Sequence, residues 1–238
     1  MAFSAQSLSR KTKNIVTISV FAALHTILDI IHGPWRQWSV YLEPLEGMTL
    51  GPKIGIAAAL IGSVVRAALT GNPLAIFGIA AEPTGVAVAG FLIGGYWWPV
   101  VLLYAIMLGA YFIHPYGRIL PLWTILDILV ALVLIYPTAK LGKKLLADRK
   151  NIKNLTLFVL LASFVSTVTD SLVRVFLLVP VGLYTLFFPT FEVLYNVFVL
   201  GAAGSYIEDV MVTVVSLMIS VPTLLTLEKS KVVRWPLS

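Results

Sequence analysis

The sequence predicts an all-α protein, a polytopic bundle of helices embedded in a membrane. Of its 238 residues, 59% are apolar and only 12% are charged, which is far from the composition of a soluble domain. The apolar residues form long runs, several of which approach the roughly 20 residues that a helix needs to cross a bilayer. The length allows several spans and short loops, so residues 1–238 are interpreted as one integral membrane domain.

The chain is predicted to have about eight membrane segments. They cover approximately residues 14–32, 38–50, 53–70, 75–95, 97–113, 119–140, 154–180 and 204–227. The second segment is too short for a straight span and is expected to be a short or tilted helix. The first is expected to be a retained helix, because it is too long for the core of a cleaved signal peptide. Residues 181–203, which Pro189 interrupts, are expected to form a re-entrant or interfacial segment on the outer side.

The basic residues predict the orientation of these segments. The net charge is +6, and Lys and Arg cluster at residues 10–13, 140–153 and 229–234. Even numbers of segments separate the clusters, so the positive-inside rule places all three clusters, and both termini, in the cytoplasm. Basic clusters of this kind mark topology and touch membrane lipid, so nucleic acid is not an expected partner. The chain has no Cys, which excludes disulfides and Cys-ligated metals.

Charged residues occur inside the segments, where each costs about 2.5–3.5 kcal/mol on insertion scales. With the predicted topology nearly all of them lie toward the outer ends, and Glu46 lies deeper. Such a one-sided group favours a ligand pocket open to the outside. The alternative is that the charges pair with one another and tie helices together. The outer residues are Asp29, Glu43, Arg66, Glu82, Asp127, Asp170, Arg174, Glu208 and Asp209.

Six of the charged residues are candidate ligand-binding residues. Glu43 and Glu46 are separated by three positions and share a helical face. The Gly51-Pro52 turn should bring Arg66 alongside, so we expect Arg66 to pair with Glu43, directly or through a ligand that bridges the two, whereas Glu46 lies deeper and is a less favoured partner of Arg66. The other three candidates are Glu82, Asp170 and Arg174.

Glu82 opens the sequence Glu82-Pro83-Thr84-Gly85, whose Pro and Gly would leave backbone groups free to line a cavity. Asp170 and Arg174, four positions apart, are expected to bridge along one helix, which is more often a structural contact than a ligand contact. A free Arg at this position would suit a carboxylate or a phosphate.

The first helix has two faces of interest. His25, Asp29 and His32 share one stripe, but two His seven positions apart on one helix are poorly placed for chelation, so no metal site is predicted. Ser19 and Ala23, continued by Thr26, form a small-residue face roughly 130° away. Small residues at this spacing let another helix approach closely.

Residues 40–98 contain a recognisable combination of features. A short second segment is followed by the turn Gly51-Pro52-Lys53-Ile54-Gly55 and the Gly/Ala-rich sequence IGIAAALIGSVVRAAL, and the next segment contains Glu82 and GVAVAGFLIGG. With the basic N-terminus and the small-residue face of the first helix, this pattern resembles the substrate-binding S components of energy-coupling factor (ECF) transporters over roughly the first hundred residues. Two features differ. S components usually have six helices, so the pair near residues 97–140 is additional. The Met-His start of the nickel and cobalt members is replaced by Met-Ala-Phe, which argues against metal uptake.

The resemblance implies a binding protein of the cell membrane that captures a small molecule of vitamin or cofactor-precursor type from outside. Glu43, Glu46, Arg66, Glu82, Asp170 and Arg174 would line or support the site. A transmembrane coupling subunit with ATPases would supply energy, since this chain has no Walker motif, and Ser19 and Ala23 would contact that partner. No bound cofactor is expected.

Two other classes of function are less favoured. A self-sufficient secondary transporter would need polar residues through the inner half and, usually, repeated halves. An intramembrane enzyme would need a nucleophile–base pair or a metal motif, and the sequence shows neither, so the chain is not expected to be an enzyme.

Overall fold

The computed structural model describes residues 10–149, 151–230 and 235–237. Within these residues the chain is almost entirely helical and contains no β-strand, which confirms the predicted all-α bundle. The helices are α1 (Arg10–Ile30), α2 (Trp38–Thr70), α3 (Ala75–Ile93), α4 (Trp98–Ile113), α5 (Pro115–Ile119), η1 (Leu122–Ile125), α6 (Leu126–Ala147), α7 (Ile152–Leu178), α8 (Tyr184–Phe187) and α9 (Phe191–Ser230).

Six helices of the described chain are long and apolar enough to cross a membrane, whereas about eight segments were predicted. The difference has two sources. The predicted second and third segments are the two halves of α2, and α4 has only 16 residues. A multi-pass membrane protein is therefore supported, with α1, α2, α3, α6, α7 and α9 as the candidate spans.

The chain turns back within α2 at Gly51, as predicted. Gly51 has φ +75°, a left-handed conformation that glycine adopts without strain, and Pro52 starts the second half, where its missing N–H is no loss. A Cβ added at Gly55 would lie 3.9 Å from Cα of Gly47, whereas eight residues of straight helix span about 12 Å. The two halves of α2 therefore lie close together near the turn.

The outer segment predicted at residues 181–203 is only partly correct. Residues 191–203 are the start of α9, a single helix of 40 residues, and only the short α8 precedes it. Pro189 lies before α9 and so does not interrupt it. Glu192 lies in the first turn of α9, where the positive end of the helix dipole favours an acidic residue. At 1.5 Å per residue α9 is about 60 Å long, about twice the hydrocarbon thickness of a bilayer.

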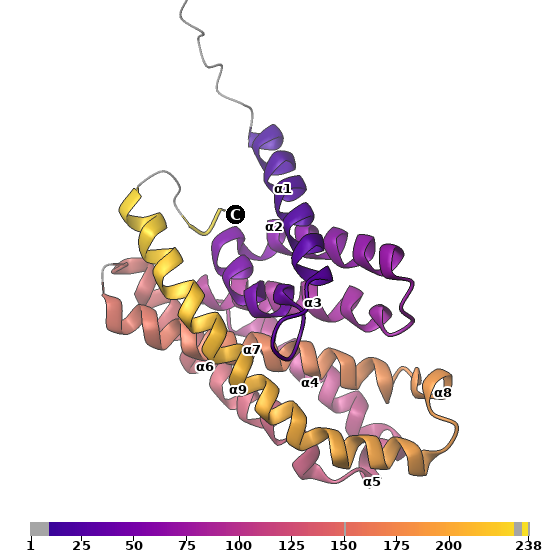
Figure 1. Ribbon diagram of the computed structural model, residues 1–238. Helices are drawn as coiled ribbons and strands as arrows, with labels where there is room; N and C mark the ends of the chain where they lie inside the picture. Colours follow the sequence, from indigo (N-terminus) through magenta and orange to yellow (C-terminus); the bar gives the residue numbers. More distant parts are fainter. Residues whose placement is uncertain (1–9, 150, 231–234, 238) are drawn as a thin grey trace, which may run out of the picture.

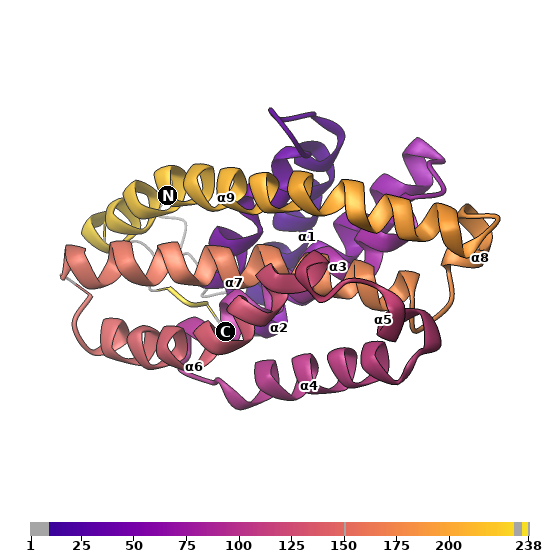
Figure 2. The same ribbon diagram turned by 90° about the horizontal axis from the view of Figure 1, so that it is seen from below.

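The four helices α4, α6, α7 and α9 run lengthwise side by side, α2 and α3 pack on α7, and α1 packs on α2 (Figures 1 and 2). Helices α5 and α8 lie at one end of this bundle. Aromatic rings join the two: Tyr116 of α5 packs on Tyr184 of α8 with ring centroids 5.2 Å apart, and it also packs on Phe191, the first residue of α9, at 4.5 Å. We call this end of the molecule the α5–α8 end.

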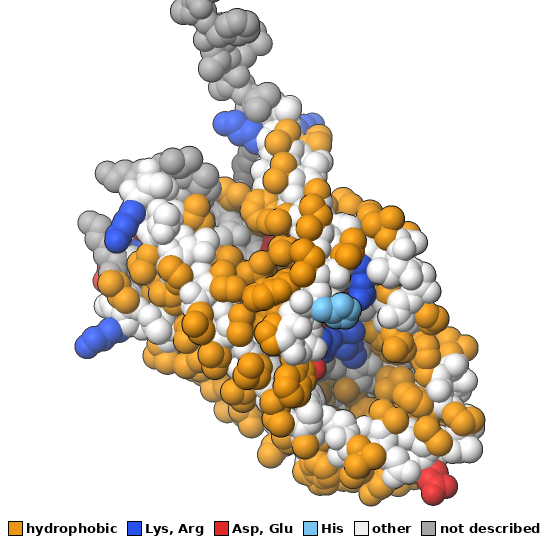
Figure 3. Space-filling model, viewed as in Figure 1, with side chains coloured by type: hydrophobic (Ala, Val, Ile, Leu, Met, Phe, Trp, Pro, Cys, Tyr) orange, Lys and Arg blue, Asp and Glu red, His pale blue; other side chains and the backbone are white. Residues whose placement is uncertain are grey.

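The basic segments gather at the opposite end (Figure 3). Arg149 pairs with Glu228 at 3.5 Å, which brings the connection between α6 and α7 to the end of α9. Asn14, Lys53 and Leu237 line one depression, so the start of α1, the turn of α2 and the C-terminal residues also meet here. Parts of the predicted basic clusters, such as residues 231–234, lie outside the described residues. That this end faces the cytoplasm stays a prediction.

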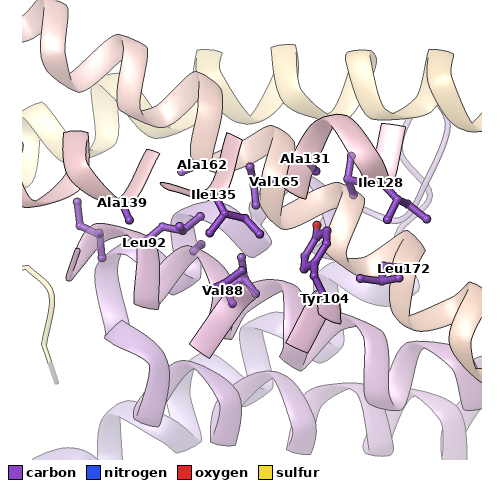
Figure 4. Packing of buried hydrophobic residues seen from close by; sticks show 14 of the residues in the cluster. Val88, Leu92, Tyr104, Ile128, Ala131, Ile135, Ala139, Ala162, Val165 and Leu172 are labelled. Carbon is purple, nitrogen blue, oxygen red and sulfur yellow. The ribbon is translucent and has the colours of Figure 1, made fainter. Parts of the chain in front are cut away.

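The apolar core lies among α3, α4, α6 and α7 (Figure 4). Leu92, Ile135 and Leu172 are almost fully buried in it, and Tyr104 adds a hydroxyl that bonds Thr169 at 2.9 Å. Helices α2 and α3 also approach closely: a Cβ added at Gly90 would lie 2.6 Å from the backbone nitrogen of Pro52. This close contact fixes α3 against the turn of α2 and so sets the position of Glu82.

Candidate functional site

All six predicted site residues belong to one buried group of polar and charged side chains, which we call the ionic network. Its members come from α1, α2, α3, α7 and α9 and from the loop before α2. They are His25, Asp29, Arg36, Ser39, Glu43, Glu46, Ser63, Arg66, Glu82, Asp170, Arg174 and Glu208. The alternative interpretation of the charges, that they pair and tie helices together, therefore holds for most of them.

His25 is at the centre of the network. Its Nδ1 lies 2.9 Å from Oε2 of Glu46, and its Nε2 lies 3.0 Å from Oε2 of Glu82. The Ser63 hydroxyl donates to the same Glu82 oxygen at 2.7 Å. All four residues are buried. Glu46, which was expected to be a less favoured partner of Arg66 than Glu43, pairs with His25 on α1 and not with Arg66.

Asp29 joins α1 to both halves of α2. The Ser39 hydroxyl donates to its Oδ1 at 2.9 Å, and Nε of Arg66 lies 3.5 Å from its Oδ2. Arg66 was predicted to pair with Glu43, and this is wrong. Because α1 packs against both halves of α2, Asp29 of α1 reaches Arg66 in the second half. The sequence had suggested a partner for Arg66 only in the first half of α2.

Glu43 has no hydrogen-bond partner for either carboxylate oxygen and is fully buried. It lies between α3 and α7: a Cβ added at Gly85 would be 2.6 Å from Oε2 of Glu43 and 3.3 Å from the carbonyl oxygen of Ser166. A buried carboxyl without a partner is costly. Such a group is a candidate for contact with something the chain itself does not supply.

The predicted bridge between Asp170 and Arg174 is confirmed. Nε and Nη2 of Arg174 donate to the two carboxylate oxygens of Asp170 at 2.6 and 3.1 Å, and Nη2 also lies 3.9 Å from Oε1 of Glu82. Arg36 extends the pairing, since it contacts Asp170 at 3.5 Å and forms a short contact with Glu208. Arg36 was not predicted as a site residue. The one sequence feature that could have indicated it is that Arg36 is among the few basic residues on the predicted outer side.

A cavity of about 340 Å³ lies beside the network at the α5–α8 end, and we call it the outer pocket. Its lining is mainly apolar and includes four Phe side chains, and Arg174 reaches it from the network with Thr124 and Ser205 as further polar groups. Two rings of the wall, Phe77 and Phe187, pack 5.5 Å apart. The remaining aromatic residues of the lining are Phe188 and Phe198.

A second cavity, of about 320 Å³, lies between α1, the first half of α2 and the end of α9. Its lining is apolar except for a few side chains, which include His25, Ser39 and Glu46 of the ionic network. We call it the α1–α9 cavity. It connects the network to the surface on the side away from the outer pocket.

Asp127 and Asp209 form a separate pair of buried carboxyls between α6 and α9. Near them the Tyr206 hydroxyl donates to the carbonyl oxygen of Trp123 in a short contact. Asp127 lies in the first turn of α6, near the end of its segment as expected, whereas Asp209 lies near the middle of α9 because this helix begins at Phe191. The sequence did not show that the two acids face each other and lie apart from the other six.

Helix α1 presents a free face. Ser19 and Ala23 are exposed, next to exposed Val20, Leu24 and Ile27. Thr26, predicted to continue this face, instead points inward and donates to the carbonyl oxygens of Ala22 and Gly62. The predicted stripe of the same helix also divides, because His25 and Asp29 are buried whereas His32 is exposed.

Comparison with known proteins found no matching family model, no similar curated protein and no similar solved structure.

Proposed function

We propose that this protein is the membrane-embedded binding subunit of an uptake system. It captures a small molecule from outside in the outer pocket, and a separate ATP-driven module supplies the energy. The observation that carries this proposal is the outer pocket itself: an aromatic cavity at the end opposite the basic segments, with Arg174 reaching into it from the ionic network.

The lining of the outer pocket suits a compact molecule with a flat apolar part and an acidic group. Phe77, Phe187 and Phe198 offer apolar surface, and ligand sites are commonly lined this way with a few polar groups for orientation. Arg174 uses Nε and Nη2 on Asp170, and its Nη1 has no hydrogen-bond partner among the described residues. A carboxylate or phosphate of the substrate could accept from that nitrogen.

The ionic network supports this role by holding the pocket open. Arg174 is fixed by Asp170 of the same helix and lies close to Glu82 of α3, so its position depends on α7 and α3. Because the Arg174 side chain is already held in place, it loses little conformational entropy when a ligand binds. Polar groups concentrated beside one pocket favour capture over self-sufficient transport, which needs a polar path through the whole thickness.

The exposed face of α1 supports the expected partner. Ser19 and Ala23 form a small-residue surface that no described part of the chain covers, and small residues allow a second helix to pack closely in lipid. We assign this face to the transmembrane coupling subunit.

The first test is mass spectrometry of small molecules that co-purify with the protein in mild detergent, followed by binding measurements with the molecule found. Arg174→Ala should weaken its binding at least tenfold, whereas Arg149→Ala, at the opposite end, should leave binding unchanged. Uptake of the molecule by proteoliposomes that contain this protein alone would contradict the need for an ATP-driven module.

The second test addresses the partner. Ala23→Leu should reduce capture of the coupling subunit from membranes while ligand binding survives, and Val133→Leu, an exposed site on α6, is the matched control. Loss of ligand binding with the partner still bound would contradict the assignment of the α1 face.

A further inference from the structure

We propose that His25, Asp29 and Glu82 bind one divalent transition-metal ion, which joins α1 to α3 inside the ionic network. The ion is a resident part of the structure and not the transported molecule. None of the three residues lines the outer pocket. From the sequence, His25, Asp29 and His32 were weighed as metal ligands and no metal site was predicted. In the structure, Glu82 lies beside His25 and Asp29, and His32 does not.

The three residues have the spacing that a common ion requires. Each offers one ligand atom, and these atoms lie within 4.8 Å of one another. Nε2 of His25 and Oε2 of Glu82 are 3.0 Å apart. Two ligands about 2.1 Å from the same ion are separated by roughly 3.0–3.4 Å when they are neighbours in octahedral or tetrahedral geometry. The pair is thus already at the spacing of adjacent ligands, and an oxygen of Asp29 lies within 4.8 Å of both atoms.

Each of the three ligands has an outer partner that orients it. With Nδ1 of His25 donating to Glu46, Nε2 can bind a metal in place of its present contact with Glu82, and a carboxylate in this position is the usual support of a metal-binding imidazole. Ser63 donates to Glu82, and Ser39 donates to Asp29. These hydrogen bonds therefore hold the three ligand side chains in orientation before an ion binds.

One ligand atom lacks a hydrogen bond. Oδ2 of Asp29 is buried and makes none, and Asp29 as a whole is only 1% exposed. The Nε of Arg66, 3.5 Å away, is itself without a hydrogen bond. A buried carboxylate oxygen in this condition costs free energy that a bound cation would recover.

The net charge of the network also favours a bound cation. Its six carboxyl side chains, Asp29, Glu43, Glu46, Glu82, Asp170 and Glu208, face only three guanidinium groups, Arg36, Arg66 and Arg174. If all are charged, the excess is three negative charges. A proton shared through His25 offsets one of them, whereas a divalent ion offsets two with the imidazole neutral.

The ligand set selects the kind of ion. One imidazole with two carboxylates suits Zn²⁺ or Mn²⁺ better than Mg²⁺, which prefers oxygen ligands and retains its water. A route of access exists, because the α1–α9 cavity is lined by His25, Ser39 and Glu46. We expect Zn²⁺ to bind most tightly, since imidazole favours it.

The test uses the full-length protein in detergent, stripped with EDTA and titrated with Zn²⁺, Mn²⁺ and Mg²⁺ by calorimetry. We expect one Zn²⁺ per chain and a higher Tm with Zn²⁺ than without. His25→Gln and Asp29→Asn should each weaken Zn²⁺ binding at least 100-fold. Glu46→Gln, which removes only the outer partner of His25, should weaken it about 10–100-fold. His32→Gln, at the exposed histidine of the same helix, is the matched control and should bind as the wild type does.

X-ray absorption at the zinc edge tests the same proposal on the wild type, without relying on variants that could fail to fold. One imidazole and oxygen ligands at about 2.0–2.2 Å are expected. A folded, stripped wild type that binds no Zn²⁺ would overturn the proposal and leave a network bridged by protons alone. Two imidazoles in the absorption spectrum, or loss of binding in His32→Gln with retention in Asp29→Asn, would also overturn it.

Discussion

Two parts of this protein of similar helical content bury very different side chains. Between α1, α2 and α3 the interior holds His25, Asp29, Glu46 and Glu82 together with close glycine contacts. Among α4, α6 and α7 it holds mainly aliphatic residues such as Ile135 and Val165. Lipid is as apolar as leucine, so burying an aliphatic side chain within a membrane gains little beyond packing. The first part is therefore held in one arrangement by ion pairs and hydrogen bonds between particular side chains. The second part is held by the packing of complementary side-chain shapes.

The largest expected effect comes from exchanging residues of equal size in the two parts. Glu82→Gln keeps the shape but removes the charge that faces His25 and Arg174, and breaking a buried pair typically costs about 3–5 kcal/mol. Ile135→Leu conserves volume in the aliphatic part and should cost less than about 1.5 kcal/mol.

Thermal unfolding in detergent measures both changes, since about 1 kcal/mol shifts Tm by roughly 2–4 °C in a chain near this length. Equal losses in the two variants would mean that the ionic network is no more specific than the aliphatic core, and the comparison would fail.

A smaller effect is expected from adding one methyl group to a glycine in each part. Gly90→Ala in α3 would place Cβ 2.6 Å from the backbone of Pro52, and backbone has little room to yield, so we expect a loss of about 1–3 kcal/mol. At Gly109 in α4 nothing lies within 4 Å, so Gly109→Ala should be neutral or stabilise by up to about 1 kcal/mol through helix propensity. The two Tm shifts should have opposite signs or differ clearly, and matching losses would show that α2 and α3 are not in close contact.

The smallest effect sharpens the pairing within the ionic network. A double-mutant cycle of Arg66→Ala with Asp29→Asn should show a coupling of about 0.5–3 kcal/mol, because the two groups are 3.5 Å apart. A cycle of Arg66→Ala with Glu43→Gln should be additive within about 0.5 kcal/mol. The unfolding free energies of the six proteins involved, wild type included, decide between the two partners. Coupling to Glu43 and additivity with Asp29 would return the pairing to the one expected from sequence.

Local rules were sufficient wherever the partners are close in the chain. The bridge from Asp170 to Arg174 follows from their spacing on one helix, and the reversal at Gly51-Pro52 follows from what those two residue types allow. The helical membrane character follows from the length of the apolar runs. The end of α9 was set correctly to within a few residues, but its start was not, because Pro189 was taken to interrupt a helix that begins after it.

Composition and spacing by themselves determined that this chain is an apolar helical bundle, that α2 turns back on itself, and that a set of charged residues shares one region. Only the tertiary structure decided that Arg66 faces Asp29, that Glu46 and Glu82 share His25, and that Arg36 joins the network. The physical reason is that helix periodicity fixes which residues share a face, whereas the crossing of α1 over the two halves of α2 decides which faces meet. That crossing depends on close contacts between residues far apart in the chain, such as His25 against Gly62, which no local pattern records.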